Sequence, residues 1–143
     1  MTRADDMGLL ARAIPESLAS ALEAVGDLPS HDWLRPPESG TVMMRGRTGG
    51  TGAPFNLGEV TATRCALLLA DGTEGHAFVQ GRDREHATRA ALVDALLQGA
   101  RADDVRRAVI EPLAREEAER RQKTAAKAEA TRVEFETLVR GED

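Results

Sequence analysis

Two arginines and four glycines lie close together in the middle of the chain, in the segment Arg45–Gly52. Glycine lets the backbone take positive φ values and approach a ligand closely, and successive free backbone N–H groups can hold an anion. The planar guanidinium of Arg45 or Arg47 matches the geometry of a phosphate group. No acidic residue interrupts the surrounding stretch from Thr41 to Gly58. These residue types predict a site for an anion such as phosphate.

The same glycines have a second interpretation. The segment lacks the Lys-Ser/Thr pair of a P-loop and the following helix of a dinucleotide-binding motif. Composition alone therefore favours a glycine-rich hairpin between two strands. For the anion-binding or partner-binding hypothesis, the candidate residues in and after this segment are Arg45, Arg47, Gly49, Gly50, Thr51, Gly52, Asn56 and Glu59.

A second pair of arginines occurs in Gln80–His86, where an expected strand gives way to an expected helix. Arg82 and Arg84 would lie beside the helix N-terminus, where anions are favoured. The alternative, which the sequence favours, makes Asp83 the helix cap and leaves both arginines in solvent. Arg82 is included among the candidates.

Arg64 is a further candidate because it interrupts the strand-like run Val60–Leu69. A charge in the middle of a strand must face solvent, a partner or an acid. Glu59 is close enough in sequence to be considered as that acid, although spacing alone does not establish the pair.

The standard catalytic and metal-binding patterns are missing from the sequence. His31, His76 and His86 are scattered, without the spacing of a metal site. The single cysteine, Cys65, lies in an apolar strand-like run, where cysteines usually serve as inert packing residues. The sequence therefore predicts no catalytic residue and no metal site in this chain.

The pattern of apolar residues predicts an α+β fold, with an antiparallel β-meander flanked by N-terminal and C-terminal helices. Residues 1–32 form a helical segment, in which Pro15 either kinks one helix or separates two. Residues 33–82 form the sheet and contain the glycine-rich loop. Its strands include Val42–Arg45, Val60–Leu69 and Gly75–Gln80, the last two joined at Asp71-Gly72.

Residues 83–130 are expected to be helical. Asp83 is the expected cap of the first helix, and Asp103 or Asp104 that of the next. Pro112 falls at a helix start or a kink. The stretch from Leu113 to about Ala130 has high helix propensity but little to bury, so we expect it to be solvated or laid across a neighbour.

Residues 131–143 regain apolar side chains, and we expect this segment to dock on a neighbouring surface. The residues expected to make that contact are Val133, Phe135, Val139 and Arg140.

Composition narrows the function further. The 143 residues predict a single domain, and the four aromatic residues offer few large groups for a self-sufficient core. This favours a subunit that completes its burial against partners. The net charge of −5 argues against a general nucleic-acid binder. No apolar run approaches the length of a membrane span, and no signal peptide is recognisable, so we expect a cytoplasmic protein.

Several stretches together resemble one family, that of the G subunit of the bacterial phosphonate carbon–phosphorus lyase system (PhnG). The matching stretches are Arg35–Gly40, Met44–Gly52, Pro54–Glu59, Thr61–Cys65, Gln80–Asp83, Asp94–Gln98 and Val133–Glu142. They occur in the family's order and cover the chain from about Trp33 to its C-terminus.

The resemblance implies a subunit of a hetero-oligomeric core complex with subunits H, I and J, extended by K and L. It implies participation in the transfer of the ribose triphosphate moiety of ATP to an alkylphosphonate, with release of adenine, in phosphonate catabolism. ATP and the alkylphosphonate would be substrates of the complex. An iron–sulfur cluster and S-adenosylmethionine would belong to a partner subunit, and this chain would hold no cofactor. The family offers no catalytic residue to carry over, so the expected role is a supporting one.

Two other functions stay open on sequence grounds. The chain could be a free-standing phosphate-binding or nucleotide-binding module that uses the glycine-rich loop. It could also be a purely structural adaptor, whose glycines only permit tight backbone packing.

Overall fold

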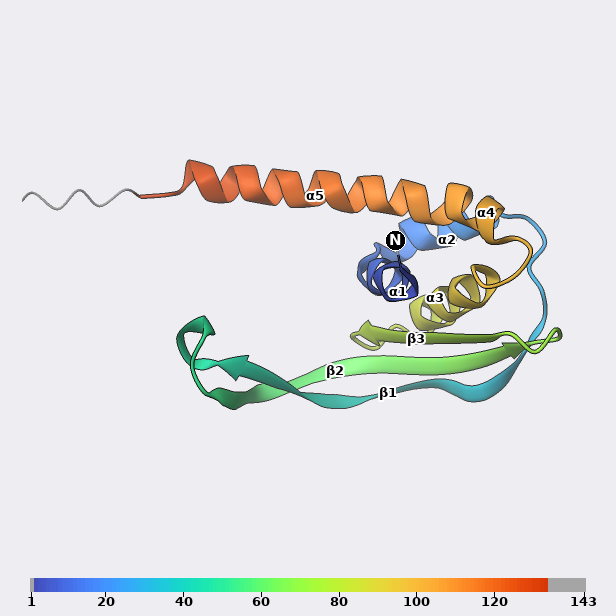
Figure 1. Cartoon of the computed structure of the whole chain (residues 1–143), viewed down its shortest axis with the longest axis horizontal. Helices are drawn as coiled ribbons and strands as arrows, with labels where there is room; N and C mark the ends of the chain where they lie inside the picture. The colour runs from blue at the N-terminus through green and yellow to red at the C-terminus, as the bar shows by residue number, and fades with distance from the viewer. Residues whose placement is uncertain (1, 134–143) are drawn as a thin grey trace, which may run out of the picture.

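The computed structural model describes residues 2–133 and confirms an α+β architecture. A three-stranded antiparallel sheet lies in the middle of the chain, and helices from both ends cover it (Figure 1). The elements in chain order are α1 (Arg3–Arg12), α2 (Pro15–Glu23), β1 (His31–Arg47), β2 (Pro54–Leu69), β3 (Glu74–Gln80), α3 (Arg84–Leu96), α4 (Ala102–Val105) and α5 (Glu111–Ala130).

Pro15 separates two helices rather than kinking one. It occupies the first turn of α2, where its missing N–H would have no intrahelical partner in any case. The start of α1 is fixed by a capping box, in which the Thr2 hydroxyl accepts the backbone N–H of Asp5 and the Asp5 carboxylate accepts the N–H of Thr2 at 2.8 Å.

The sheet has the order β1-β2-β3, so each strand pairs with its neighbour in sequence. The expected turn at Asp71-Gly72 joins β2 to β3, and the Asp71 carboxylate accepts the N–H of Thr73 at 2.9 Å. Strands β1 and β2 have 17 and 16 residues, whereas β3 has seven and ends opposite Ala62. Residues 41–61 therefore extend past β3 as a separate arm, here called the projecting hairpin (Figure 1).

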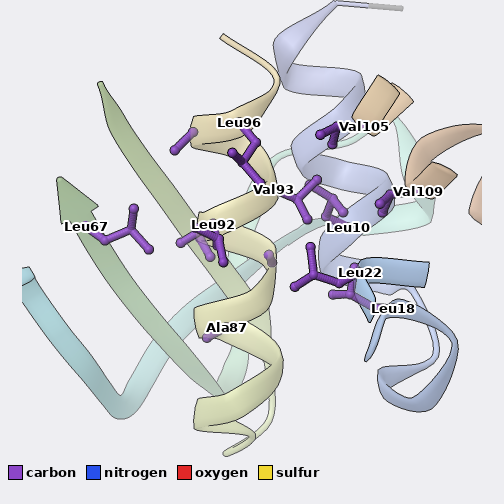
Figure 2. Packing of buried hydrophobic residues seen from close by; sticks show 14 of the residues in the cluster. Leu10, Leu18, Leu22, Leu67, Ala87, Leu92, Val93, Leu96, Val105 and Val109 are labelled. Carbon is purple, nitrogen blue, oxygen red and sulfur yellow. The ribbon is translucent and has the colours of Figure 1, made fainter. Parts of the chain in front are cut away.

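Helix α3 is the centre of the core. Its N-cap is Asp83, as expected, whose carboxylate accepts the N–H of His86 at 2.8 Å. Figure 2 shows α3 between the strand that carries Leu67 and the helical segments that carry Leu10, Leu22 and Val109.

The core is built from aliphatic residues. Among the aromatic residues that the structure describes, Trp33, Phe55 and Phe78 are 40%, 44% and 51% exposed. A substantial part of the apolar surface of these side chains is thus left in solvent. This outcome agrees with the shortage of large core groups in the composition.

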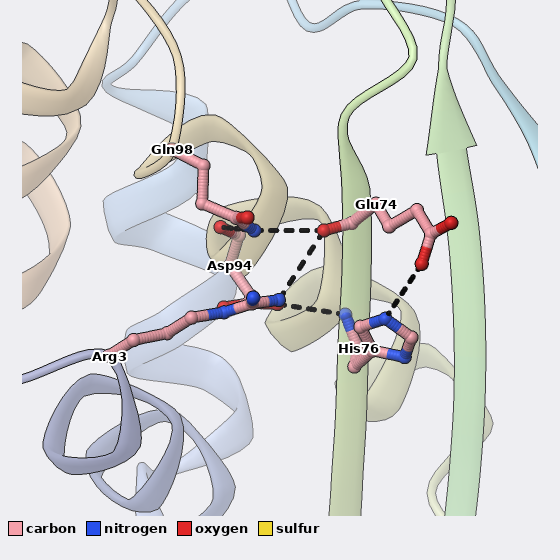
Figure 3. Close-up of polar contacts among 5 residues, drawn as sticks. All are labelled: Arg3, Glu74, His76, Asp94 and Gln98. Carbon is pink, nitrogen blue, oxygen red and sulfur yellow. Dashed lines mark hydrogen bonds and ion pairs between the residues drawn. The ribbon is translucent and has the colours of Figure 1, made fainter.

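An ion pair between a half-exposed arginine and a buried carboxylate joins three elements (Figure 3). The carboxylate of Asp94, on α3, accepts two hydrogen bonds from the guanidinium of Arg3 at 2.9 and 2.8 Å. It also accepts the backbone N–H of His76, on β3, at 2.9 Å. A second pair joins Asp6 of α1 to Arg106 at 2.8 Å. The N-terminal helix is thereby fixed to both the sheet and the C-terminal helices.

The C-terminal helices begin differently from the prediction. Neither Asp103 nor Asp104 caps α4: both lie in its first turn, and Arg101 occupies the N-cap position without a capping hydrogen bond. A π-helical turn then leads into α5, with Pro112 in its first turn as expected. Beyond Glu117 every described residue of α5 is exposed, and the helix projects on the same side of the molecule as the hairpin (Figure 1).

Candidate functional site

The candidate residues fall into three places instead of one site. Arg82 lies where β3 passes into α3, the residues from Arg45 to Asn56 lie at the far end of the projecting hairpin, and Arg64 lies on the opposite face of the sheet. Alternation along the strands decides the faces, because successive side chains point to opposite sides. Thr41, Met43 and Arg45 share one face, whereas Val42 and Met44 share the other.

The backbone of Thr61 and the hydroxyl of Thr63 anchor the loop that carries Arg82. The N–H of Gly81 donates to the carbonyl of Thr61 at 2.8 Å, and the Thr63 hydroxyl donates to the carbonyl of Gly81 at 2.7 Å. Because Thr63 has one proton to donate, it accepts in its 2.8 Å contact with the hydroxyl of Ser39. Gly81 has φ of 95°, which favours glycine at this position. The start of α3 is thus held against β2.

This anchoring produces a polar pocket of about 370 Å³. It is lined by Ser39, Gly40, Thr41, Thr61, Arg82 and Arg84. Neither arginine has an ion-pair partner in the part of the chain that the structure describes. Two guanidiniums and several hydroxyls beside a helix N-terminus form an arrangement suited to a phosphate or phosphonate group. We call it the arginine pocket.

Arg45 and Asn56 are neighbours across the projecting hairpin, on the same face as the arginine pocket. Arg45 lies four residues beyond Thr41, which places its Cα about 13 Å farther along the strand. Glu59 pairs with Met43 between these two positions. The polar face therefore runs from the pocket to the tip of the hairpin, without bringing Arg45 into the pocket.

The tip itself accounts for most of the glycines. Gly49 and Gly50 have φ of 59° and 83°, and the N–H of Gly52 donates to the carbonyl of Thr48 at 2.8 Å. A Cβ at residue 52 would lie 2.6 Å from that carbonyl oxygen. Arg47 donates to the carbonyl of Gly52 at 3.2 Å. The glycine-rich hairpin that composition favoured is therefore the observed structure.

Arg64 does not pair with Glu59. Its Nε donates to the carboxylate of Glu38 at 2.9 Å, across the β1–β2 ladder. Arg35 donates to the same carboxylate at 2.6 Å. The hydrogen bond from Arg35, and to a lesser extent that from Arg64, lowers the pKa of Glu38 below its usual value. Glu59 was the wrong candidate because pairing depends on strand register, which places Arg64 opposite Glu38.

Four polar side chains of the arginine pocket are not among the candidates, namely those of Ser39, Thr41, Thr61 and Arg84. The alternating Thr61 and Thr63 were a signal for hydroxyls on one face of a strand. Arg84 lies close to Arg82 in the sequence. The approach of both arginines to β1 and β2, however, depends on contacts between segments that are far apart in the chain.

Comparison with known proteins supplies the decisive observation. The sequence matches the family described as phosphonate metabolism protein PhnG over residues 1–141. The chain belongs to the PhnG family. It is 46% identical, over 146 aligned residues, to a protein of Rhizobium meliloti (strain 1021) described as alpha-D-ribose 1-methylphosphonate 5-triphosphate synthase subunit PhnG. The alignment covers 99% of this chain and 90% of that relative.

Cys65 is the single cysteine of this PhnG family member, and the structure shows whether its thiol could act as a nucleophile. It is buried, its thiol contacts the carbonyl of Ala87 at 3.3 Å, and burial raises its pKa to about 11. A thiol in this state is a packing group and a poor nucleophile. Within residues 2–133, no group of three or more His, Cys, Asp or Glu residues is placed to hold a metal ion.

Val133 is exposed, whereas Phe135, Val139 and Arg140 lie outside the described residues. In the described part of the chain, no helix has both the length and the apolar character needed to cross a membrane.

Proposed function

We propose that the chain is a supporting, non-catalytic subunit of a synthase that transfers the ribose triphosphate moiety of ATP to an alkylphosphonate and releases adenine. The observation that carries this proposal is the 46% identity, over 99% of the chain, to a protein described as a subunit of alpha-D-ribose 1-methylphosphonate 5-triphosphate synthase. In this role the whole chain acts as one domain of a larger complex.

The arginine pocket is the part of the surface that suits the reaction best. Both the substrate triphosphate and the phosphonate are anions, and two arginines without ion-pair partners among the described residues can neutralise part of that charge. We propose that the polar face of the chain borders the path of these substrates. The residues that perform the chemistry, and the iron–sulfur cluster and S-adenosylmethionine of the later cleavage, belong to partner subunits. Those partners are subunits H, I and J, with K and L beyond them.

The test removes both charges at the pocket. Arg82→Ala with Arg84→Ala, placed in the reconstituted complex, lowers adenine release at least tenfold while assembly stays intact. Arg107→Ala is the matched control, because Arg107 is an exposed arginine whose only ion pair among the described residues is with Asp104. Unchanged adenine release in the double variant would contradict the role of the pocket.

The far end of the polar face is tested separately. Arg45→Ala with Arg47→Ala weakens either assembly or adenine release if the tip borders the substrate path or packs against the I subunit. If both stay unchanged, the tip has neither role and its glycines serve the turn alone. That outcome favours the purely structural adaptor. The backbone hydrogen bonds that close the turn at the tip already support this interpretation.

The C-terminal segment is expected to contribute to docking. Removal of residues 131–143 weakens co-purification with the other subunits. A complex of normal composition and yield would remove this role from the segment.

The alternative of a free-standing binding module is tested on the isolated chain. Micromolar binding of ATP or a phosphonate without the other subunits would favour such a module.

A further inference from the structure

Strand β3 is shorter than β1 and β2, so part of β2 is left without a neighbouring strand on one side. Strand β3 pairs with β2 from Leu68 back to Ala62, and the last backbone contact on this side is the 2.8 Å hydrogen bond from Gly81 to Thr61. Among residues 2–133, nothing pairs with β2 on that side from Pro54 to Val60. Backbone N–H and C=O groups of alternate residues point to the same edge, so those of Glu59 face the unoccupied side. Such an edge is a template for another strand.

An apolar surface accompanies this edge. Val42, Met44 and Phe78 are 36%, 46% and 51% exposed on the face opposite α3. With Val60 and Ala62 they form the floor of a groove of about 540 Å³. Phe55 and Leu57 extend the apolar surface, because both approach the position where a side chain at residue 46 would lie. The face that carries these residues is distinct from the polar face.

Helices form the other wall of the groove. Ala11 and Arg12 of α1 and Arg120 of α5 line it, opposite the strands. The groove therefore opens at the edge of the sheet where β3 has ended, with strand residues on one side and residues of α1 and α5 on the other. A segment seated there would continue the line of β3.

The charges around the groove have one predominant sign. The charged residues that line it and the adjoining hollow are Arg12, Arg64 and Arg120 against Glu38 alone. Two nearby carboxylates each contact two arginines: Glu38 contacts Arg35 and Arg64, and Glu117 contacts Arg12 and Arg121. This positive rim stands out in a chain of net charge −5. Its complement is a segment that carries carboxylates.

We propose that this groove receives an extended segment of a partner subunit of the synthase, which adds a strand to β2 beyond β3. The segment has apolar side chains at alternate positions, which face Val42, Met44 and Phe78, and at least one carboxylate near Arg12 and Arg120. Main-chain hydrogen bonds to the free edge contribute affinity, and the apolar face and the arginines select the sequence. This proposal rests on the proposed function, since it assumes a synthase complex.

Two adjacent methionines provide the sharpest test. Met43 and Met44 have the same side chain and are 51% and 46% exposed, but they lie on opposite faces of the hairpin. In co-purification with the other subunits, Met44→Ser weakens association at least tenfold, whereas Met43→Ser stays within about twofold of the unchanged chain. Equal association of the two variants would overturn the proposal.

Hydrogen exchange tests the strand addition directly. On assembly, the backbone amide of Glu59 becomes protected at least tenfold, because its N–H acquires an acceptor. No added protection would contradict a strand at this edge. Protection already present in the isolated chain would also overturn it. Loss of that protection on removal of residues 134–143 would assign the groove to this chain's own end, and a dependence on concentration would assign it to a second copy.

The two levels of the proposal fail in different ways. If the unchanged chain does not co-purify with the subunits of the synthase, the proposed function fails. If the unchanged chain assembles and both the methionine variants and the exchange of Glu59 give the contrary results above, the docking mode alone fails.

Discussion

At the scale of single residues, Asp94 of α3 joins α1 and β3 through its carboxylate. Its carboxylate is almost fully buried, yet it accepts two hydrogen bonds from Arg3 and one from the backbone of His76. Next to it, the amide of Gln98 donates to the carbonyl of Glu74 at 2.8 Å. One short stretch of α3 therefore holds both α1 and β3, which gives a structural reason for the resemblance of Asp94–Gln98 to the family.

Replacing Asp94 by alanine leaves the N–H of His76 and one side of the Arg3 guanidinium without an acceptor. We expect the free energy of unfolding to fall by about 2 kcal/mol or more, as for the loss of charge-assisted hydrogen bonds to a buried group. Glu85→Ala breaks the exposed pair with Arg89 and changes stability by less than about 0.5 kcal/mol. Urea denaturation of both variants checks this, and equal stability of the two would contradict it.

The thiol of Cys65 is expected to resist alkylation in the folded chain. Burial raises its pKa to about 11, so at pH 8 about one molecule in a thousand carries the reactive thiolate. Labelling with iodoacetamide at pH 8 is therefore negligible over minutes and becomes complete when urea unfolds the chain. Rapid labelling of the native chain would show that Cys65 is accessible and would reopen the question of its reactivity.

At the scale of elements, the contact of α3 with β3 sets how closely the two layers approach. A Cβ at residue 75 would lie 2.0 Å from the carbonyl oxygen of Ala91 and 2.9 Å from the Cβ of Ala95. The close packing of α3 on β3 therefore requires glycine at residue 75 of the strand, against the backbone of Ala91 and the small side chain of Ala95 on the helix.

Gly75→Ala is expected to destabilise the chain by about 2 kcal/mol or more, because helix and strand must separate. Gly40→Ala is the control, since a Cβ at that position meets nothing within 4 Å. Its effect on the midpoint of thermal unfolding is expected to be small. If both substitutions lower the midpoint equally, the close packing of α3 on β3 is not the cause.

The elements were predictable where local signals agree. Asp83 begins α3, and Asp71-Gly72 turns β2 into β3, as the sequence indicates. The full length of β1 was hidden, because Pro36 and Pro37 interrupt the pattern, and prolines are tolerated only on an edge strand or at a bulge. The two faces of the projecting hairpin were also hidden, since they depend on a register that shifts between Met44 and Arg45.

The candidate site was predictable by residue type more than by place. The sequence identifies Arg82 as a residue suited to anions, but Ser39 and Thr41 reach it through the pairing of β1 with β2. Contacts such as that of Arg3 with Asp94 join residues 91 positions apart, and no local pattern encodes them. Family resemblance therefore identified the subunit, whereas the fold was needed to separate a polar face from an apolar one.

At the scale of the whole molecule, two arms project to the same side of a compact base (Figure 1). One is the projecting hairpin, and the other is α5, whose residues after Glu117 are exposed. Neither arm has a core of its own, and the described aromatic rings lie at the surface. Such a shape is typical of a subunit whose arms are covered by partners, which agrees with the description of the relative as a synthase subunit.

The central claim is that this chain works as a subunit of the phosphonate synthase complex, and purification from the native host tests it most directly. The tagged chain is isolated from cells grown on an alkylphosphonate as the phosphorus source, and its companions are identified by mass spectrometry. We expect subunits H, I and J in fixed proportion to the chain, and adenine release from ATP when the purified complex receives the phosphonate with any further subunit it requires. Recovery of the chain alone, from cells in which the other subunits are present, would contradict the account.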